Sequence, residues 1–188
     1  MKISGNEVRV GNIIEYENSL WGVVKTQHTQ PGKGGAYMQV EMKNLVTGTK
    51  KNERFRSAES VERVHLEEFP YQYLYKDGSN FVFMDQTNFE QILLSEDFIG
   101  DDAPFLQDNM VIDICMYNDK PIKIKLPDSV ILQVTEAEPV VKGQTATSSY
   151  KPALLENGVK IQVPPHIDAG MRVVVNTGDR TYVERSKD

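Results

Sequence analysis

The fold class is decided by Tyr71-Gln72-Tyr73-Leu74-Tyr75-Lys76-Asp77-Gly78-Ser79-Asn80-Phe81-Val82-Phe83-Met84, in which a turn signal separates two strand patterns. Tyr71–Tyr75 and Phe81–Met84 are rich in aromatic residues, which favour strands. The residues between them include Asp77-Gly78, a strong signal for a tight turn. Alternation of side chains along such strands turns one face of each toward a core. The stretch therefore predicts two strands joined by a turn.

The same combination recurs along the chain. Further strand patterns lie at Gly22–Lys25, Met38–Met42, Val111–Ile114, Val130–Val134, Val159–Val163 and Arg172–Val175. Further turn signals lie at Glu156–Gly158 and Asn176–Asp179. Many short strands at this spacing favour small barrels or sandwiches. The sequence therefore predicts an all-β chain.

Only two segments have a helical pattern. Asn88–Leu94 follows Thr87, which is a plausible N-cap, and the stretch around Asp102–Gln107 predicts another turn or two of helix. We therefore expect helix content to be low.

Charge changes from basic to acidic between Arg63 and Pro70 of the 188-residue chain, which suggests a boundary near residue 64. Leu126-Pro127-Asp128 is a candidate for a second boundary, near 128, which depends on the family resemblance given below. Together they would give three modules, at 1–64, 65–128 and 129–188. Residues 1–64 carry ten Lys/Arg against seven Asp/Glu, whereas residues 65–127 carry four against twelve. Modules of about 60 residues are near the lower limit for independent folding, so neighbours are expected to stabilise one another. The basic first module suggests that one end of the protein faces an anionic partner.

Several classes of protein are disfavoured. No apolar run approaches the roughly 20 residues needed to span a bilayer, and the N-terminus lacks the apolar stretch of a secretory signal. The single cysteine, Cys115, cannot form an intrachain disulfide, and with three histidines no zinc-site spacing appears. No G-x-S-x-G or H-E-x-x-H motif is present. We therefore expect a cytoplasmic protein with no cofactor and no catalytic site of its own.

The segment Pro31-Gly32-Lys33-Gly34-Gly35-Ala36-Tyr37, called the Lys33 loop below, lies between two strand patterns. Its glycines permit positive φ and close approach of a partner, and they leave the Lys33 ammonium unobstructed. The simplest alternative is a glycine-rich turn with a solvated lysine. A phosphate-binding P-loop fails in detail, because Gly34 follows the lysine and Gln27 stands where the first glycine belongs.

The Lys33 loop resembles the modification loop of bacterial elongation factor P. Other segments resemble this family in the same order along nearly the whole chain. They are Asn52–Ser57, Tyr73–Tyr75, Phe83-Met84, Phe89–Gln91, and Lys151–Ala153 with Gly158, Val163-Pro164 and Gly170. The resemblance implies three β-barrel domains, a KOW/SH3-like barrel followed by two OB-folds, in an L-shaped arrangement of about the size of a tRNA.

The resemblance also implies a function. Members of this family bind 70S ribosomes stalled at consecutive prolines, beside the peptidyl-tRNA, and promote peptide-bond formation without catalysing it themselves. The lysine matching Lys33 reaches the CCA end of the prolyl peptidyl-tRNA. In many members it carries a covalent adduct, often a β-lysyl group, added by a lysine-modifying enzyme. We expect a monomer whose acidic second module faces ribosomal protein near the exit site.

Further residues gain roles only through this resemblance. The basic residues of the first module are candidates for contact with tRNA phosphate, with solvated surface as the alternative for each: Arg9, Lys25, Lys43, Lys50, Lys51, Arg54 and Arg56. Tyr182 and Arg185 match residues associated with the small-subunit end, with an ordinary strand-end aromatic and a surface cation as the alternative. Gln144 departs from a family loop that often reads Gly-Asp-Thr and approaches exit-site mRNA.

Three other interpretations stay open from the sequence. A general single-strand RNA-binding OB protein would need aromatic platforms on a basic face, yet the aromatic strands lie in the acidic module. A close paralogue that lacks a known modification resembles the family throughout, although the Pro-Gly-Lys-Gly-Gly loop and the C-terminal signature favour elongation factor P itself. An enzyme is disfavoured by the missing catalytic motifs.

Overall fold

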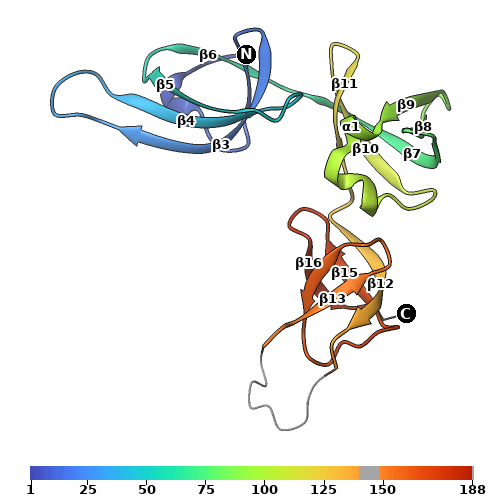
Figure 1. Ribbon diagram of the computed structural model, residues 1–188. Coiled ribbons are helices and arrows are strands. Elements are labelled where there is room, and N and C mark those ends of the chain that lie inside the picture. The colour runs from blue at the N-terminus through green and yellow to red at the C-terminus, as the bar shows by residue number, and fades with distance from the viewer. Residues whose placement is uncertain (140–148, 188) are drawn as a thin grey trace. The chain divides into compact units, whose positions relative to one another are not determined.

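A computed structural model describes residues 1–139 and 149–187 of the chain. The strands within these ranges form three sheets of six, five and five strands (Figure 1). The prediction of an all-β fold is therefore confirmed, and the arrangement is consistent with three β-barrel domains. Among the described residues, no helix is long and apolar enough to cross a membrane.

The first sheet has the order β1-β6-β2-β3-β4-β5. Its strands are β1 (Lys2–Ser4), β2 (Ile13–Tyr16), β3 (Ser19–Thr29), β4 (Tyr37–Asn44), β5 (Lys50–Arg56) and β6 (Ser60–Val64). Alternation along β4 buries Met38, Val40 and Met42, whose side chains join Val8 and Ile14 in one core. This alternation turns the intervening residues of β4 away from the core.

A short 3₁₀ segment, η1 (Gly5–Glu7), follows β1 and is hydrogen-bonded to the turn between β5 and β6. The Gly5 amide donates to the Glu59 carbonyl at 2.8 Å, and the Asn6 amide donates to the Ser57 carbonyl at 3.3 Å. These bonds join the two outer parts of the first sheet, and so help to close it into a barrel.

The second sheet has the order β11-β10-β7-β8-β9. Its strands are β7 (Glu67–Asp77), β8 (Asn80–Asp85), β9 (Gln91–Ser95), β10 (Val111–Tyr117) and β11 (Lys120–Lys125). β7 and β8 are the two strands predicted around Asp77-Gly78, and Gly78 adopts a φ of +61° in the turn between them. The Tyr73 ring lies 5.5 Å from the Phe83 ring, and both side chains are buried. These aromatic residues therefore fill a core and do not form an open platform.

The helix predicted over Asn88–Leu94 is wrong. Asp85 explains the difference, because its carboxylate accepts hydrogen bonds from the amides of Thr87 and Asn88 and begins a turn. Phe89 then adopts a φ of +62°, and its amide donates to the Asp85 carbonyl. The chain leaves this turn as β9, which pairs with β8. A side chain that bonds nearby backbone amides competes with helix formation in this way.

Two short helical segments follow β9. In α1 (Glu96–Ile99) the Ser95 hydroxyl accepts from the Phe98 amide at 3.2 Å, a cap that the sequence reading missed. The next segment, η2 (Gly100–Phe105), overlaps the turn predicted around Asp102–Gln107. Helix content is low, as expected.

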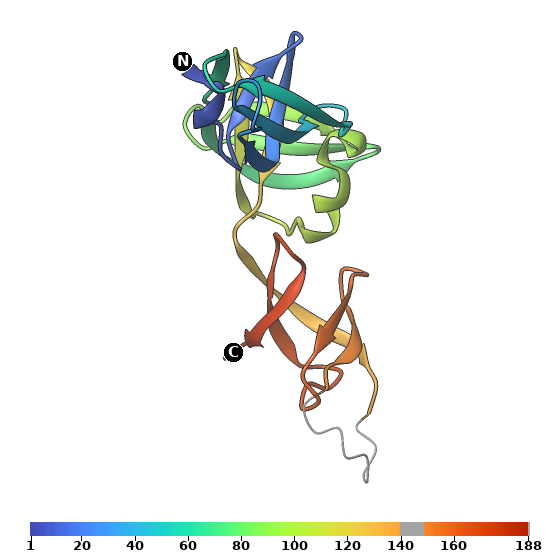
Figure 2. The same ribbon diagram turned by 90° about the vertical axis from the view of Figure 1, so that its left-hand side faces the viewer.

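The third sheet has the order β14-β13-β12-β15-β16, and its strands are orange to red in Figure 2. They are β12 (Ser129–Ala137), β13 (Lys151–Leu155), β14 (Lys160–Val163), β15 (Arg172–Asn176) and β16 (Thr181–Arg185). Their core includes Val134, Val163 and Val173, all with no exposed surface. Phe105 of η2 belongs to the same core and is equally buried.

The Arg180 side chain lies against Phe105, which is buried in the core of the third sheet. Its guanidinium lies 5.3 Å from the Phe105 ring centre and donates to the Asp101 carbonyl. Burial raises the pKa of the neighbouring Asp102 carboxyl, and the Arg180 charge partly offsets that rise. Through these contacts, η2 is attached to the third sheet.

The chain divides into two compact units. One holds residues 1–69 and 114–123, and the other holds residues 70–113 and 124–188. Most of the second sheet therefore groups with the third, as the Phe105 contact leads one to expect. The module boundaries near 64 and 128 stay a prediction.

Candidate functional site

The Lys33 loop extends past the paired ends of two long strands. β3 and β4 pair as far as Thr29 opposite Tyr37, and residues 30–36 connect them at the far end of this ribbon (Figure 1). The Ser57 amide donates to the Ala36 carbonyl at 3.1 Å, which fixes the root of the loop to the end of β5. Pro31, Ala36 and Tyr37 at the root are half-buried, whereas the residues between Pro31 and Ala36 are exposed.

The tip of the loop is open on all sides. Side-chain carbons built at Gly32, Gly34 or Gly35 would meet no atom within 4 Å. Gly34 has a φ of +102°, a conformation that glycine adopts without strain. Lys33 is exposed and forms no hydrogen bond or ion pair with any residue that the structure describes. The lysine is therefore free to approach a partner, as the sequence predicts.

An aromatic and basic surface lies at the root of the loop. Tyr37 pairs with Arg56, and Gln39 pairs with Arg54, across β4 and β5. The Arg54 guanidinium lies 4.9 Å from the centre of the Tyr37 ring, and Arg54 and Arg56 are both exposed. Two of the predicted RNA-contacting cations thus lie beside the Lys33 loop.

The other predicted RNA-contacting cations differ in the contacts that their side chains make within the chain. Lys25, Lys43 and Lys50 are exposed, and the last two are direct neighbours across β4 and β5. Arg9 is also exposed, but its guanidinium donates to the carbonyls of Asn6 and Val8. All these side chains remain candidates for contact with an anionic partner.

Lys51 is held by groups of its own chain. Its ammonium lies 2.7 Å from a Glu17 oxygen, 3.6 Å from a Glu53 oxygen and 5.0 Å from the centre of the Tyr16 ring. The hydrogen bond to Glu17 raises the pKa of Lys51. Burial, with the nearby Glu53 charge, raises the pKa of Tyr16. The structure thus places Lys51 in an ion-pair network. Sequence alone could not tell whether the Lys51 ammonium is paired in this way or is open to a phosphate.

Comparison with known proteins identifies the family. The family model of the elongation factor P KOW-like domain matches residues 4–61, that of its OB domain residues 66–124, and that of its C-terminal domain residues 130–185. Elongation factor P of Brucella abortus is 59% identical over 186 residues, covering 99% of this chain and 100% of the relative. The chain belongs to the elongation factor P family. It is therefore a translation elongation factor.

Elongation factor P of Brucella ovis is likewise 59% identical over 186 residues, with the same coverage. Among solved structures, translation initiation factor 5A from Methanococcus jannaschii matches with a TM-score of 0.55 and 17% sequence identity. That match covers 67% of this chain and 94% of the archaeal protein. At this level of identity the match supports the fold of this chain and nothing further.

The predicted ribosome-facing residues near the C-terminus of the chain lie on β16. Tyr182 pairs with Val175 and packs against the core of the third sheet, and burial raises the pKa of its hydroxyl. Arg185 pairs with Val173 and is exposed. The tyrosine thus has a packing role, whereas the arginine is available to a partner. Gln144 lies outside the described residues.

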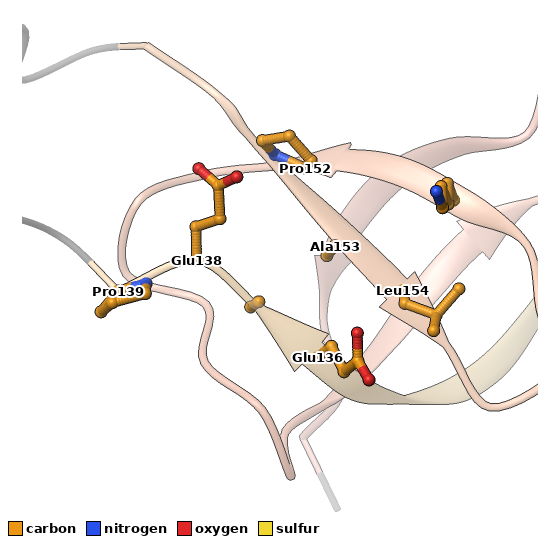
Figure 3. Close-up of a pocket in the computed structure, with 8 residues that line it drawn as sticks. Glu136, Glu138, Pro139, Pro152, Ala153 and Leu154 are labelled. Atoms are coloured by element: carbon orange, nitrogen blue, oxygen red, sulfur yellow. The ribbon is translucent and has the colours of Figure 1, made fainter.

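A hollow lies over the paired strands β12 and β13. Figure 3 shows Glu138 on the side of Pro152 and Glu136 on the side of Leu154. Its remaining lining includes Ala137, Pro139, Ala153 and Lys160. Within the described ranges, no group of three His, Cys, Asp or Glu side chains could hold a metal ion.

The sequence reading missed the hollow at the root of the Lys33 loop. Ser57, Ala58 and Glu59 line it together with the end of the loop and the two arginines of β5. The sequence marks Asn52–Ser57 as a family resemblance and its two arginines as candidates for RNA contact, but it does not place them beside Tyr37. The closeness of this segment to Tyr37 depends on the pairing of β4 with β5, which local sequence does not reveal.

Proposed function

We propose that this elongation factor promotes peptide-bond formation on 70S ribosomes stalled at consecutive prolines, with Lys33 positioning the CCA end of the prolyl peptidyl-tRNA. The observation that carries the proposal is the free ammonium of Lys33 on an open glycine loop, beyond the last paired residues of β3 and β4. Membership of the elongation factor P family supports it.

The chemistry of lysine suits this role. An ammonium on a flexible stem can contact phosphate and ribose oxygens without reading bases. Proline is a sterically restricted participant in peptide transfer, and holding a reactant in a productive geometry can lower a barrier by several kcal/mol. The factor supplies orientation, and the ribosomal peptidyl transferase performs the reaction.

The second part of the proposal is a covalent adduct on Lys33, such as a β-lysyl group, added by a lysine-modifying enzyme. An adduct would lengthen the side chain and add an amine donor. The exposure of the loop gives such an enzyme access. Mass spectrometry of the Lys33 peptide from protein purified from its native cell tests this part; an unmodified mass would remove it.

The third part concerns location and partners. We propose a cytoplasmic monomer whose acidic middle module, with twelve Asp/Glu against four Lys/Arg over residues 65–127, faces basic ribosomal protein near the exit site. Chemical cross-linking on the ribosome tests the contact. Cross-links from this module mainly to RNA would oppose it.

The main experiment is translation of a reporter containing Pro-Pro-Pro in a system that lacks the endogenous factor. Wild-type protein should relieve the stall, and Lys33→Ala should leave it close to the level without the factor. Lys120→Ala is the control, because Lys120 is an exposed lysine far from the loop in sequence, at the start of β11. Full relief by Lys33→Ala would overturn the proposal.

A further inference from the structure

A hollow at the root of the Lys33 loop has the composition of a nucleotide-binding surface. It has a volume of about 710 Å³, within the range of small-ligand sites. Its lining consists of Gly35, Ala36, Tyr37, Arg54, Arg56, Ser57, Ala58 and Glu59. It therefore combines the end of the Lys33 loop with the outward face of β5 and the turn after it.

Strand alternation explains why these side chains gather there. Met38 and Phe55 point into the core, so Tyr37 on β4 and the two arginines on either side of Phe55 point outward. Arg54 lies diagonally across from Tyr37 and stacks on its ring at 4.9 Å. Arg54 is exposed, so its side chain is accessible to another flat group.

The charge in the hollow favours an anion. Neither Arg54 nor Arg56 forms an ion pair within the part of the chain that the structure describes. The one carboxylate in the lining is that of Glu59, which accepts a hydrogen bond from the Arg56 backbone amide. Two free guanidinium groups against one engaged carboxylate leave the hollow net positive.

We propose that this hollow binds one unpaired nucleotide of single-stranded RNA, with the base stacked on the Arg54–Tyr37 pair and the phosphate held by Arg56. Stacking on aromatic and guanidinium planes is a sequence-tolerant way to hold unpaired bases. Lys33 is four residues from Tyr37, at most about 14 Å of chain, so one short strand can reach both. The inference rests on the proposed function and adds a second contact to the same RNA end.

In the test, the full chain is titrated with the RNA tetranucleotide ACCA as probe. NMR monitors the arginine Nε–H signals and the tyrosine ring signals during the titration. We expect the signals of Arg54 and Tyr37 to shift on titration. Arg54→Lys keeps the charge but removes the planar group, and should weaken binding about tenfold if one stacked base is lost. Arg172→Lys is the matched control, because Arg172 is an exposed arginine on β15.

A duplex RNA with the same number of phosphates separates stacking from general attraction to phosphate. Equal affinity for duplex and tetranucleotide, wild-type affinity in Arg54→Lys, or no binding of the tetranucleotide would each overturn the inference. Shifts at Arg54 with an acidic peptide but not with RNA would assign the hollow to a protein partner and also overturn the inference.

A failed RNA titration together with a Lys33-dependent reporter would leave the proposed function standing. A Lys33-independent reporter would remove that function whatever the titration showed.

Discussion

At the scale of single residues, Gly5 shows how the first barrel depends on a close approach of two backbones. A Cβ at this position would lie 2.2 Å from the Arg56 carbonyl oxygen and 3.1 Å from the Phe55 Cβ. Both neighbours are fixed, one by the backbone and the other by the core. We expect Gly5→Ala to lower the free energy of unfolding by about 1–3 kcal/mol, the usual cost of overpacking. Urea unfolding of the full chain measures this loss.

Gly32→Ala and Gly35→Ala are the controls for this prediction. Neither position has a positive φ, and a Cβ at either would meet no neighbour within 4 Å. Their unfolding free energies should therefore stay within about 0.5 kcal/mol of wild type. A Gly5→Ala protein that unfolds at the wild-type urea concentration would show that the contact with β5 can relax without cost.

At the scale of elements, sequence predicts structure where local signals agree. The strands around Asp77-Gly78 carry their own turn, and the structure confirms both of them. The helix predicted over Asn88–Leu94 is wrong because the apolar residues of this segment fit a helix as well as a strand. The amides of Thr87 and Asn88 donate to the carboxylate of Asp85, a residue that precedes that segment.

The candidate site also has some features that local sequence predicts and others that it does not. The exposure of Lys33 follows from the glycines beside it, so local sequence predicts it well. The stacking of Arg54 on Tyr37 depends on strand register, and the engagement of Lys51 depends on Glu17, 34 residues away. Pairings of this kind require the folded sheet and could not be read from a single sequence.

Phe105 tests how much the packing of η2 into the third sheet contributes to stability. The residue lies in η2 but has no exposed surface within the core of the third sheet. Phe105→Ala should therefore lower the free energy of unfolding by about 3–5 kcal/mol, through lost transfer energy and the cavity left behind. Thermal or urea unfolding, followed by circular dichroism, measures the change.

Phe89→Ala is a matched control, because Phe89 is an aromatic residue with 67% of its surface exposed. It should change stability by less than about 0.5 kcal/mol. If Phe105→Ala were as mild as Phe89→Ala, the packing of η2 into the third sheet would not contribute to stability.

At the scale of the whole molecule, charge is separated along the chain. Residues 1–64 carry a net charge of +3, from ten Lys/Arg and seven Asp/Glu, within a chain whose net charge is −6. The protein as a whole would be repelled by RNA, so any attraction must come from local groups. Free lysines of the first sheet, such as Lys43 and Lys50, are the groups available for it.

This separation predicts how ribosome binding depends on salt. Each phosphate contact that releases a counterion adds about 0.7–0.9 to the slope of log affinity against log salt concentration. A triple variant, Lys25→Gln/Lys43→Gln/Lys50→Gln, should therefore flatten the slope by up to about 2–3 in equilibrium binding to 70S ribosomes over a salt series. Lys51→Gln should leave the slope unchanged and instead lower the urea midpoint, because Lys51 is paired with Glu17. A wild-type slope in the triple variant would show that ribosomal RNA is contacted through other groups, and a flattened slope in Lys51→Gln would show that the Glu17 pair opens on binding.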